Sequence, residues 1–220
     1  MATYTTHQEP AANTTYGSDD IFVNCSGSWG GAVYVSWKTK LTLNGSTFVS
    51  NTASQGGGAL GIARTTLDST DVLYLNNVSN GRGGAININY SSAIKGGTFS
   101  GNRAVTTGGA IFQSKDGYST LTISNAVQFT GNRAGGDGGA IYQTGTDLAT
   151  NVTGATFFGN TSGGNGGALY IESNASLTNV TFDGNVAATN GGAVFVGGTA
   201  NVSVSNTAFL RSPHPRGPGG

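Results

Sequence analysis

The sequence is poor in the residue types from which reactive or charged sites are built. Its 220 residues include one cysteine and two histidines, and only 9% are charged, where about a quarter is usual. Cys25 stands alone, which excludes an internal disulfide and leaves an isolated thiol, with intermolecular pairing as the alternative. Ten basic and ten acidic residues cancel without clustering. The chain therefore lacks the basic footprint of a nucleic-acid-binding or anionic-membrane-binding protein, and we expect no nucleic-acid partner.

Long apolar runs are also missing. No stretch approaches the roughly 20 apolar residues of a transmembrane helix, so we expect no direct membrane span. Residues Met1 to Pro10 are polar and show no signal peptide. Either the protein stays inside a cell or the chain is a fragment of a longer protein, and we favour the fragment.

What the sequence does contain is glycine and an internal repeat. Gly accounts for 38 residues, and a unit of about 27 residues recurs along the chain. One signature is a bulky residue three positions before Asn, at Ile21/Asn24, Phe48/Asn51, Tyr74/Asn77, Phe99/Asn102, Phe129/Asn132, Phe157/Asn160 and Phe182/Asn185, with Phe209/Ser212 as a decayed eighth copy. The other is Gly-Gly-Ala, whose Ala follows each of the seven Asn by eight residues. Repeats of this length indicate a solenoid.

Each repeat alternates short β-branched and aromatic runs with Gly and Asn clusters, and helical periodicity is absent. We expect three strands per repeat: one ending on the bulky residue, one after Gly-Gly, and a looser one such as Leu121–Ile123. Three parallel strands per unit predict an all-β fold, a parallel β-helix of about eight coils. The predicted divisions are a polar N-terminal segment at 1–16, the repeat domain at 17–212 and a disordered Pro/Gly tail at 213–220.

The recurring letters have structural roles in such a fold. Stacked coils place equivalent residues above one another, so the seven Asn residues are predicted to form a hydrogen-bonded ladder. The bulky residue of each signature is expected to fill the core, and Gly-Gly to supply backbone angles that other residues avoid. Exposed ends of the coil stack favour self-association.

Catalytic and metal-binding residues are hard to assemble from this sequence. Carbohydrate-active β-helices need two or three carboxylates on adjacent coils, and only Asp116 and Asp147 occupy similar repeat positions. Because loop carboxylates are usually solvated, we predict no catalytic residues, no metal and no cofactor. His7 and His214 lie outside the repeats, so no nucleophile–base pair can be proposed.

A column of outward residues is the one candidate binding surface. If the residue after Gly-Gly-Ala faces the core, the next one faces outward. That column contains Tyr34, Gly61, Asn87 and then four aromatic residues, namely Phe112, Tyr142, Tyr170 and Phe195. An aromatic stripe of this kind suits binding to a sugar or a protein. The alternative is that a loop, either Ser114 to Thr120 or Thr144 to Ala149, folds over it.

The paired signatures resemble the repeats of the chlamydial polymorphic membrane proteins, a family of autotransporter adhesins. The segments that carry the resemblance are "FSGNRAVTTGGAI" from Phe99, "FTGNRAGGDGGAI" from Phe129, "FFGNTSGGNGGAL" from Phe157 and "FDGNVAATNGGAV" from Phe182. The resemblance implies a right-handed β-helical passenger region, displayed at the cell surface or outer membrane and used in adhesion. Members of that family also carry a secretion signal and a C-terminal membrane barrel, which this sequence does not show.

These observations predict a non-enzymatic, surface-displayed or secreted repeat module with an adhesive or structural role. Its expected partner is a protein or glycan of a host or neighbouring cell surface. The alternative is a fragment of a carbohydrate-active β-helix, a polysaccharide lyase or hydrolase. Binding to a glycan without release of product would distinguish the first from the second.

Overall fold

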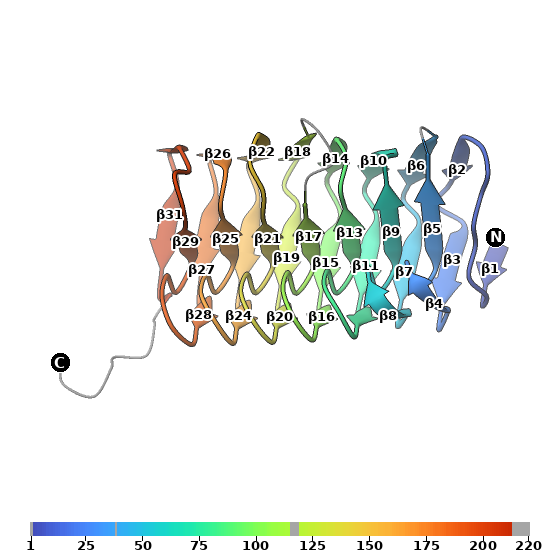
Figure 1. Ribbon diagram of the computed structural model, residues 1–220, viewed down its shortest axis with the longest axis horizontal. Coiled ribbons are helices and arrows are strands. Elements are labelled where there is room, and N and C mark those ends of the chain that lie inside the picture. The colour runs from blue at the N-terminus through green and yellow to red at the C-terminus, as the bar shows by residue number, and fades with distance from the viewer. Residues whose placement is uncertain (1, 38, 115–118, 213–220) are drawn as a thin grey trace.

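The chain folds into a parallel β-solenoid, seen in a computed structural model that describes residues 2–37, 39–114 and 119–212 (Figure 1). All strand pairs in these ranges are parallel, and no helix occurs in them. Each complete coil visits four sheets, which we call A, D, B and C in chain order. The tail at 213–220 lies outside the described residues.

Sheet A has nine strands: β1 (Ala2–Tyr4), β3 (Asp20–Val23), β7 (Thr47–Val49), β11 (Leu73–Leu75), β15 (Thr98–Ser100), β19 (Gln128–Thr130), β23 (Thr156–Phe158), β27 (Thr181–Asp183) and β31 (Ala208–Leu210). Sheet D has seven: β4 (Ser26–Trp29), β8 (Thr52–Gly56), β12 (Val78–Ser79), β16 (Arg103–Ala104), β20 (Arg133–Ala134), β24 (Thr161–Ser162) and β28 (Val186–Ala187).

Sheet B also has seven: β5 (Val33–Ser36), β9 (Leu60–Ala63), β13 (Ile86–Ile88), β17 (Ile111–Gln113), β21 (Ile141–Gln143), β25 (Leu169–Ile171) and β29 (Val194–Val196). Sheet C has eight: β2 (Thr14–Tyr16), β6 (Lys40–Asn44), β10 (Thr66–Thr70), β14 (Ser92–Lys95), β18 (Ser119–Ser124), β22 (Leu148–Thr153), β26 (Asn174–Thr178) and β30 (Val202–Ser205).

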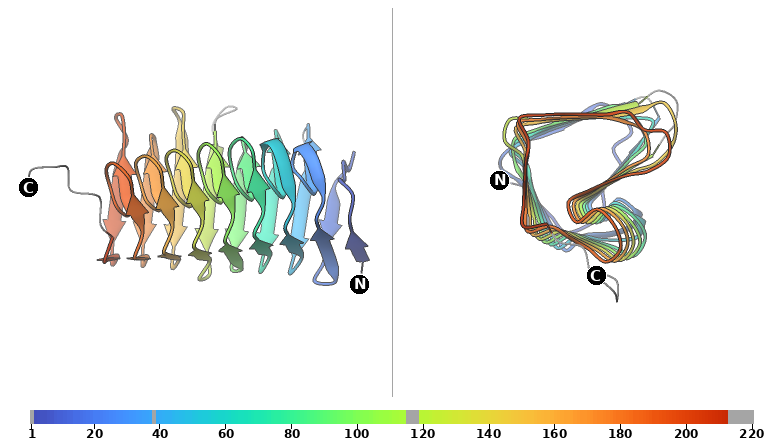
Figure 2. Two further views of the ribbon diagram at one scale, coloured as in Figure 1. Left: turned by 90° about the horizontal axis from the view of Figure 1, so that it is seen from below. Right: turned by 90° about the vertical axis from the view of Figure 1, so that its left-hand side faces the viewer.

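The described part of the chain therefore makes seven complete coils, with β1 and β2 before them and β31 after them. The predicted parallel β-helix of about eight coils is confirmed. Seen from the C-terminal end, the chain runs down sheet A and up sheet B, anticlockwise as it approaches the viewer, so the solenoid is right-handed (Figures 1 and 2). The expected three strands per repeat become four, because the two or more residues after each ladder position form the short strands of sheet D.

The interior is a continuous stack of aromatic rings supplied by sheet A. One ring per coil points inward, and neighbouring ring centroids lie 4.5–5.4 Å apart in near-parallel planes, from Tyr4 and Phe22 to Phe182 and Phe209. The rings from Phe22 to Phe182 are fully buried. Their burial, at about 25 cal/mol per Å² of apolar surface, is the main stabilising contribution to the fold.

Beside the rings runs a ladder of asparagine side chains. Asn51, Asn77, Asn102, Asn132, Asn160 and Asn185 are all fully buried. Each of the first five donates from its backbone N–H and from Nδ2 to the Oδ1 of the next, at 2.9–3.0 Å. Each of the six also donates from Nδ2 to the carbonyl of the aromatic residue one coil earlier, so the turn's backbone groups are satisfied without water.

Asn24, the seventh predicted ladder residue, is not in the ladder. The register pairs Phe22 with Phe48, so the inward ring of this coil is Phe22 rather than Ile21. Cys25 takes the ladder position: its N–H donates to Asn51 Oδ1 at 2.9 Å, while Asn24 is exposed. The prediction was wrong because the sheet D segment of this coil is one residue shorter than in the other coils. The ladder position therefore falls on Cys25, and the eight-residue spacing from Asn24 to Ala32 is a coincidence. The shortening appears as a register shift between Gly27 and Trp29.

The N-terminal residues belong to the solenoid, whereas the sequence predicted a separate segment at 1–16. Strand β1 pairs with β3 in sheet A, and β2 pairs with β6 in sheet C. Gln8 bridges to Val33 in sheet B. Tyr4 and Tyr16 then pack against the ring of Phe22, so these residues close the N-terminal end of the described core. The absence of the repeat signature concealed this partial coil.

The Gly-Gly corner between sheets D and B folds inward and indents one side of each coil (Figure 2). In the fifth coil Gly138 has a φ of +67°, which only glycine adopts without strain. A Cβ on Gly139 would meet the carbonyl oxygen of Gly167 and the backbone of Thr161 in sheet D. The corner therefore packs backbone against backbone, which explains why both glycines recur in every coil.

Candidate binding groove

The predicted outward column lies on sheet B, next to the indented corner. Main-chain pairing stacks its members one coil apart, in the order Tyr34, Gly61, Asn87, Phe112, Tyr142, Tyr170 and Phe195. The preceding residue of each strand, for example Ile141 in β21, faces the core. The alternation of a strand thus presents these seven residues on the outer face.

The last four members form one stack of rings. Centroids of Phe112, Tyr142, Tyr170 and Phe195 follow one another at 5.6, 4.7 and 5.2 Å, with planes 12–22° apart. Phe112 is 4% exposed, whereas Tyr142, Tyr170 and Phe195 are half-buried. The loop Thr144 to Ala149 therefore does not bury the last three rings, while the loop Ser114 to Thr120 lies partly outside the described residues.

The carboxylate of Glu172 lies beside the two tyrosines Tyr142 and Tyr170. The Tyr170 hydroxyl donates to Glu172 Oε1 at 3.2 Å, and Thr144 Oγ1 donates to Glu172 Oε2 at 2.6 Å. Desolvation, followed by the charge of Glu172, raises the pKa of Tyr170 to about 12. The same two causes raise the pKa of Tyr142. Both phenols are therefore neutral hydrogen-bonding groups at physiological pH.

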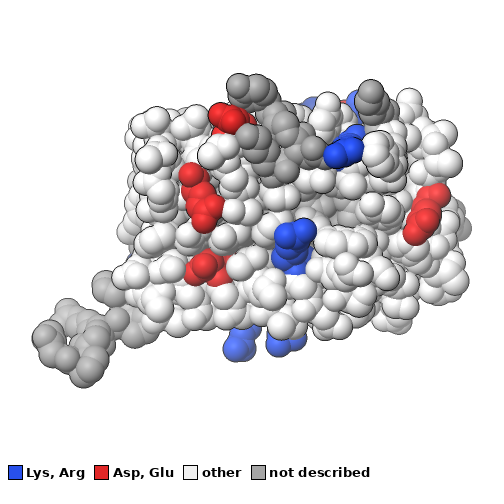
Figure 3. Space-filling view, viewed as in Figure 1, with Lys and Arg blue, Asp and Glu red and all other residues white. Residues whose placement is uncertain are grey.

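A second column faces the first across the indentation. It consists of the residue directly before each Gly-Gly-Ala, namely Trp29, Gly56, Arg82, Thr107, Asp137, Asn165 and Asn190. The first glycine of each of the first six corners donates its N–H to the carbonyl of the corresponding residue in the next coil, at 2.9–3.1 Å, which fixes this stacking. We call the channel between the two columns the groove. Figure 3 shows its face as mostly uncharged, with a basic group near the middle and acidic groups towards both ends.

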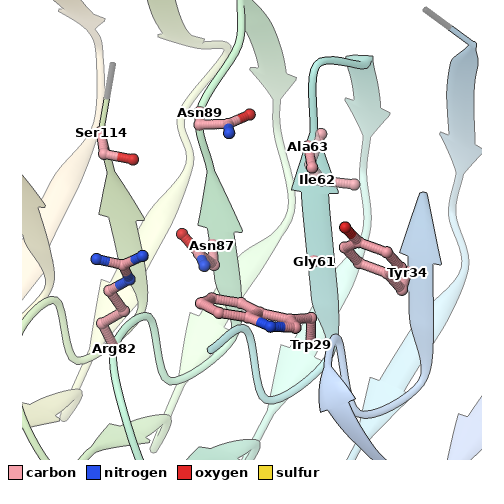
Figure 4. Close-up of a pocket in the computed structure, with 9 residues that line it drawn as sticks. All are labelled: Trp29, Tyr34, Gly61, Ile62, Ala63, Arg82, Asn87, Asn89 and Ser114. Atoms are coloured by element: carbon pink, nitrogen blue, oxygen red, sulfur yellow. The ribbon is translucent and has the colours of Figure 1, made fainter. Parts of the chain in front are cut away.

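The groove deepens into a pocket of about 210 Å³ near its N-terminal end (Figure 4). In the second coil the residue of each column is a glycine, Gly56 in one column and Gly61 in the other, so neither column presents a side chain there. Trp29 and Tyr34 of the preceding coil and Arg82 and Asn87 of the following coil line the space instead. The pocket was not predicted from the sequence, because it depends on both columns and the sequence pattern pointed to one only. The sequence signal for the pocket was that Gly56 and Gly61, one from each column, fall in the same coil.

The carboxylate pair considered for catalysis is not assembled by the described structure. Asp147 lies on an exposed loop with a φ of +58°, and Asp116 lies outside the described residues. His7 contacts Glu9, with Nε2 3.1 Å from Oε1, near the N-terminal end. Across residues 2–37, 39–114 and 119–212, no three His, Cys, Asp or Glu side chains lie close enough together to hold a metal ion. The same ranges contain no helix that is long and apolar enough to cross a bilayer.

Comparison with known proteins supports the repeat assignment. Residues 96–114, 126–144, 154–172 and 179–197 each match the Chlamydia polymorphic membrane protein repeat. No significant match to the chain was found among curated proteins or among solved structures. Each matched segment covers one strand of sheet A, the ladder Asn, the Gly-Gly-Ala corner and one strand of sheet B.

Each matched segment also carries one ring of the outer stack, Phe112, Tyr142, Tyr170 or Phe195. The family repeat thus comprises both the structural ladder and the column beside the groove, while the looser strand of sheet C lies mostly or wholly outside it. With four such segments in successive coils, the chain carries repeats of the chlamydial polymorphic membrane protein family.

Proposed function

We propose that the chain is a non-enzymatic, surface-associated adhesive module that attaches to a partner through the aromatic column of sheet B. The observation that carries this proposal is the continuous stack of Phe112, Tyr142, Tyr170 and Phe195, of which the last three rings are half-exposed. Rings that stack on one another in register form a flat, rigid surface, so little conformational entropy is lost when a partner covers them.

The surface association rests on the repeat family, whose name describes membrane proteins of Chlamydia. The shape of the solenoid is consistent with display, because each coil contacts only its neighbours and repeats the same surface. A linear column of rings then offers several equivalent contacts to one extended ligand, or to several ligands on one cell surface. The partner class is a protein or glycan of another cell surface.

A carbohydrate-active enzyme is the competing proposal, since an elongated groove with aromatic rings also suits a polysaccharide. It receives less support, because Glu172 is engaged by Tyr170 and Thr144 and Asp137 accepts from the Asn165 amide. A glycosidase would need two carboxyl groups about 5–10 Å apart on either side of the scissile bond. The repeat family is not a known enzyme family.

One experiment separates the two proposals. The purified chain, coupled to fluorescent beads, is applied to cell layers and to immobilised polysaccharides, and the supernatant is assayed for reducing ends and unsaturated sugars. The adhesive proposal predicts saturable attachment without product. Release of sugar that rises with incubation time would favour the enzyme, and absence of attachment to any surface would overturn the adhesive role.

A further inference from the structure

The pocket at Gly61 has a chemistry different from the ring stack. Its floor and one wall are apolar rings, Trp29 and Tyr34, whereas the opposite wall is polar, with Arg82 and Asn87 (Figure 4). Trp29, Tyr34, Arg82 and Asn87 lie outside the four segments that match the family repeat, whereas Ser114, which also lines the pocket, is the last residue of the first segment. The rings and polar side chains of the pocket are therefore particular to this part of the chain.

Two glycines, Gly56 and Gly61, leave room for the pocket because they have no side chains. A Cβ on Gly61 would approach the Tyr34 ring to 2.8 Å, and one on Gly56 would approach the Trp29 ring to 2.8 Å and Asn87 Nδ2 to 2.7 Å. The two rings and the amide therefore lie directly against glycine backbone. Since the coils before and after are two steps apart, the backbones of the two walls are separated by roughly 9–10 Å, twice the strand spacing. The side chains reach into this gap, and the guanidinium of Arg82 lies 5.5 Å from the ring centroid of Trp29.

Arg82 supplies a positive charge without a carboxylate partner among the described residues. Its guanidinium lies 4.5 Å from the ring centroid of Phe112 and 5.5 Å from that of Trp29. Rings orient the guanidinium but leave its five N–H donors available, which a carboxylate can accept in pairs. Glu9, near the N-terminal end of the groove, is engaged with His7.

Asn87 is the second polar feature. Its side chain is enclosed in the pocket wall, with the residue only 9% exposed, and it makes no hydrogen bond with any described residue. Because its amide opens into the pocket, water or a ligand that enters the pocket can satisfy its hydrogen bonds. In Figure 4 it points into the space above Trp29, between the indole and the side chain of Asn89. The amide can donate to and accept from vicinal hydroxyl groups.

We propose that this pocket binds one acidic sugar residue, a pyranose that carries a carboxylate. The carboxylate is bound by Arg82, the ring hydroxyls by Asn87, and the apolar face of the sugar lies on Trp29. A space of about 210 Å³ accommodates one sugar ring. It is smaller than the roughly 300–1,000 Å³ of pockets for drug-sized ligands. The proposal is independent of the adhesive role, because a free sugar can bind whether or not the chain mediates attachment.

The test compares methyl β-glucuronide with methyl β-glucoside, which differ at C6 by a carboxylate against a hydroxymethyl group. Isothermal titration should show the wild-type chain binding the glucuronide at least about tenfold more tightly. Arg82→Met should remove this preference, and Arg82→Gln should do the same. The matched control is Arg133→Met, which deletes the charge of an exposed arginine on sheet D. It should keep the preference.

Equal binding of the two glycosides, or a preference that persists in both Arg82 variants, would overturn the proposal. Acetate that competes as well as the glucuronide would show that the sugar ring is not recognised, and would overturn it too. A Tyr142→Ser/Tyr170→Ser variant should retain the glucuronide preference, since those rings lie outside the pocket. If it does so, the pocket stands independently of attachment: a wild-type chain that attaches to no surface would overturn the adhesive role and leave the pocket intact. Loss of the preference in this variant would place the sugar elsewhere.

Discussion

Asn132 and Asn160 are joined twice across one coil step. The backbone N–H and the Nδ2 of Asn132 both donate to the Oδ1 of Asn160, at 3.0 and 2.9 Å. Asn132 Nδ2 also donates to the Phe99 carbonyl, and its own Oδ1 accepts the same pair of bonds from Asn102. One buried side chain therefore links three successive coils, and its amide satisfies four hydrogen bonds that water cannot replace.

Asn132→Ala is expected to lower the free energy of unfolding by about 1–3 kcal/mol, because it leaves buried backbone donors and acceptors without partners. Chemical denaturation measures this loss. The control is Asn125→Gly, an exposed position whose φ of +61° glycine accepts without strain. Equal losses at the two positions would contradict a structural ladder.

Cys25 ends the ladder and is predicted to be inert in the folded chain. It is 1% exposed, its thiol donates to the Tyr4 carbonyl at 3.3 Å, and desolvation raises its pKa. Alkylation by iodoacetamide at pH 8 should be at least about 100-fold slower in the native chain than in guanidinium. The reagent cannot reach the buried thiol, and its raised pKa disfavours the reactive thiolate. Comparable rates in the two states would show that the N-terminal coil opens readily and that residues 2–16 do not close it.

The phenol of Tyr170 gives a prediction for alkaline pH. Burial and Glu172 raise its pKa to about 12, above the ordinary value of 10.0. Between these two values the unfolded chain releases a proton that the folded chain retains, so this contribution to stability is complete below pH 10 and is lost as pH rises through 12. Absorbance at the phenolate band should show the late titration.

Glu172→Gln should move the Tyr170 titration towards the ordinary value, since it removes the carboxylate's charge while keeping a hydrogen-bond acceptor. A titration that does not change in this variant would mean that burial alone raises the pKa. A wild-type titration at the ordinary value would contradict the packing of the ring stack on sheet B.

The sequence predicted most of the solenoid because its repeat is rigid where the structure is rigid. The spacing from ladder Asn to Gly-Gly-Ala is fixed by backbone packing at the corner, as seen at Gly139 against Thr161 and Gly167. The same fixed spacing made Asn24 misleading. Because the sheet D segment of the first coil is one residue shorter than its counterparts, Asn24 keeps the usual spacing to Ala32 although the ladder position in this coil belongs to Cys25. A shift of this kind cannot be recognised from the spacing of residues in the sequence.

The outer column could be located from strand alternation alone, but its surroundings could not. Phe112 is buried under the guanidinium of Arg82, a residue that belongs to the preceding coil and to the other column. Pairing across the groove depends on how far the Gly-Gly corner folds inward, which the sequence does not state. The N-terminal coil was missed for a related reason: β1 and β2 add to sheets A and C through main-chain bonds, which need no repeat signature.

The central claim is that the stacked rings of sheet B are the contact surface. Its most direct measurement is attachment of the Tyr142→Ser/Tyr170→Ser variant to the surface that binds the wild-type chain. We predict at least about a tenfold loss of attachment, with the circular dichroism spectrum and melting temperature nearly unchanged. The matched control is Phe158→Ser, which removes a ring that is 50% exposed on sheet A, and it should attach normally. Undiminished attachment of the double variant, an equal loss in Phe158→Ser, or unfolding of the double variant would contradict the claim.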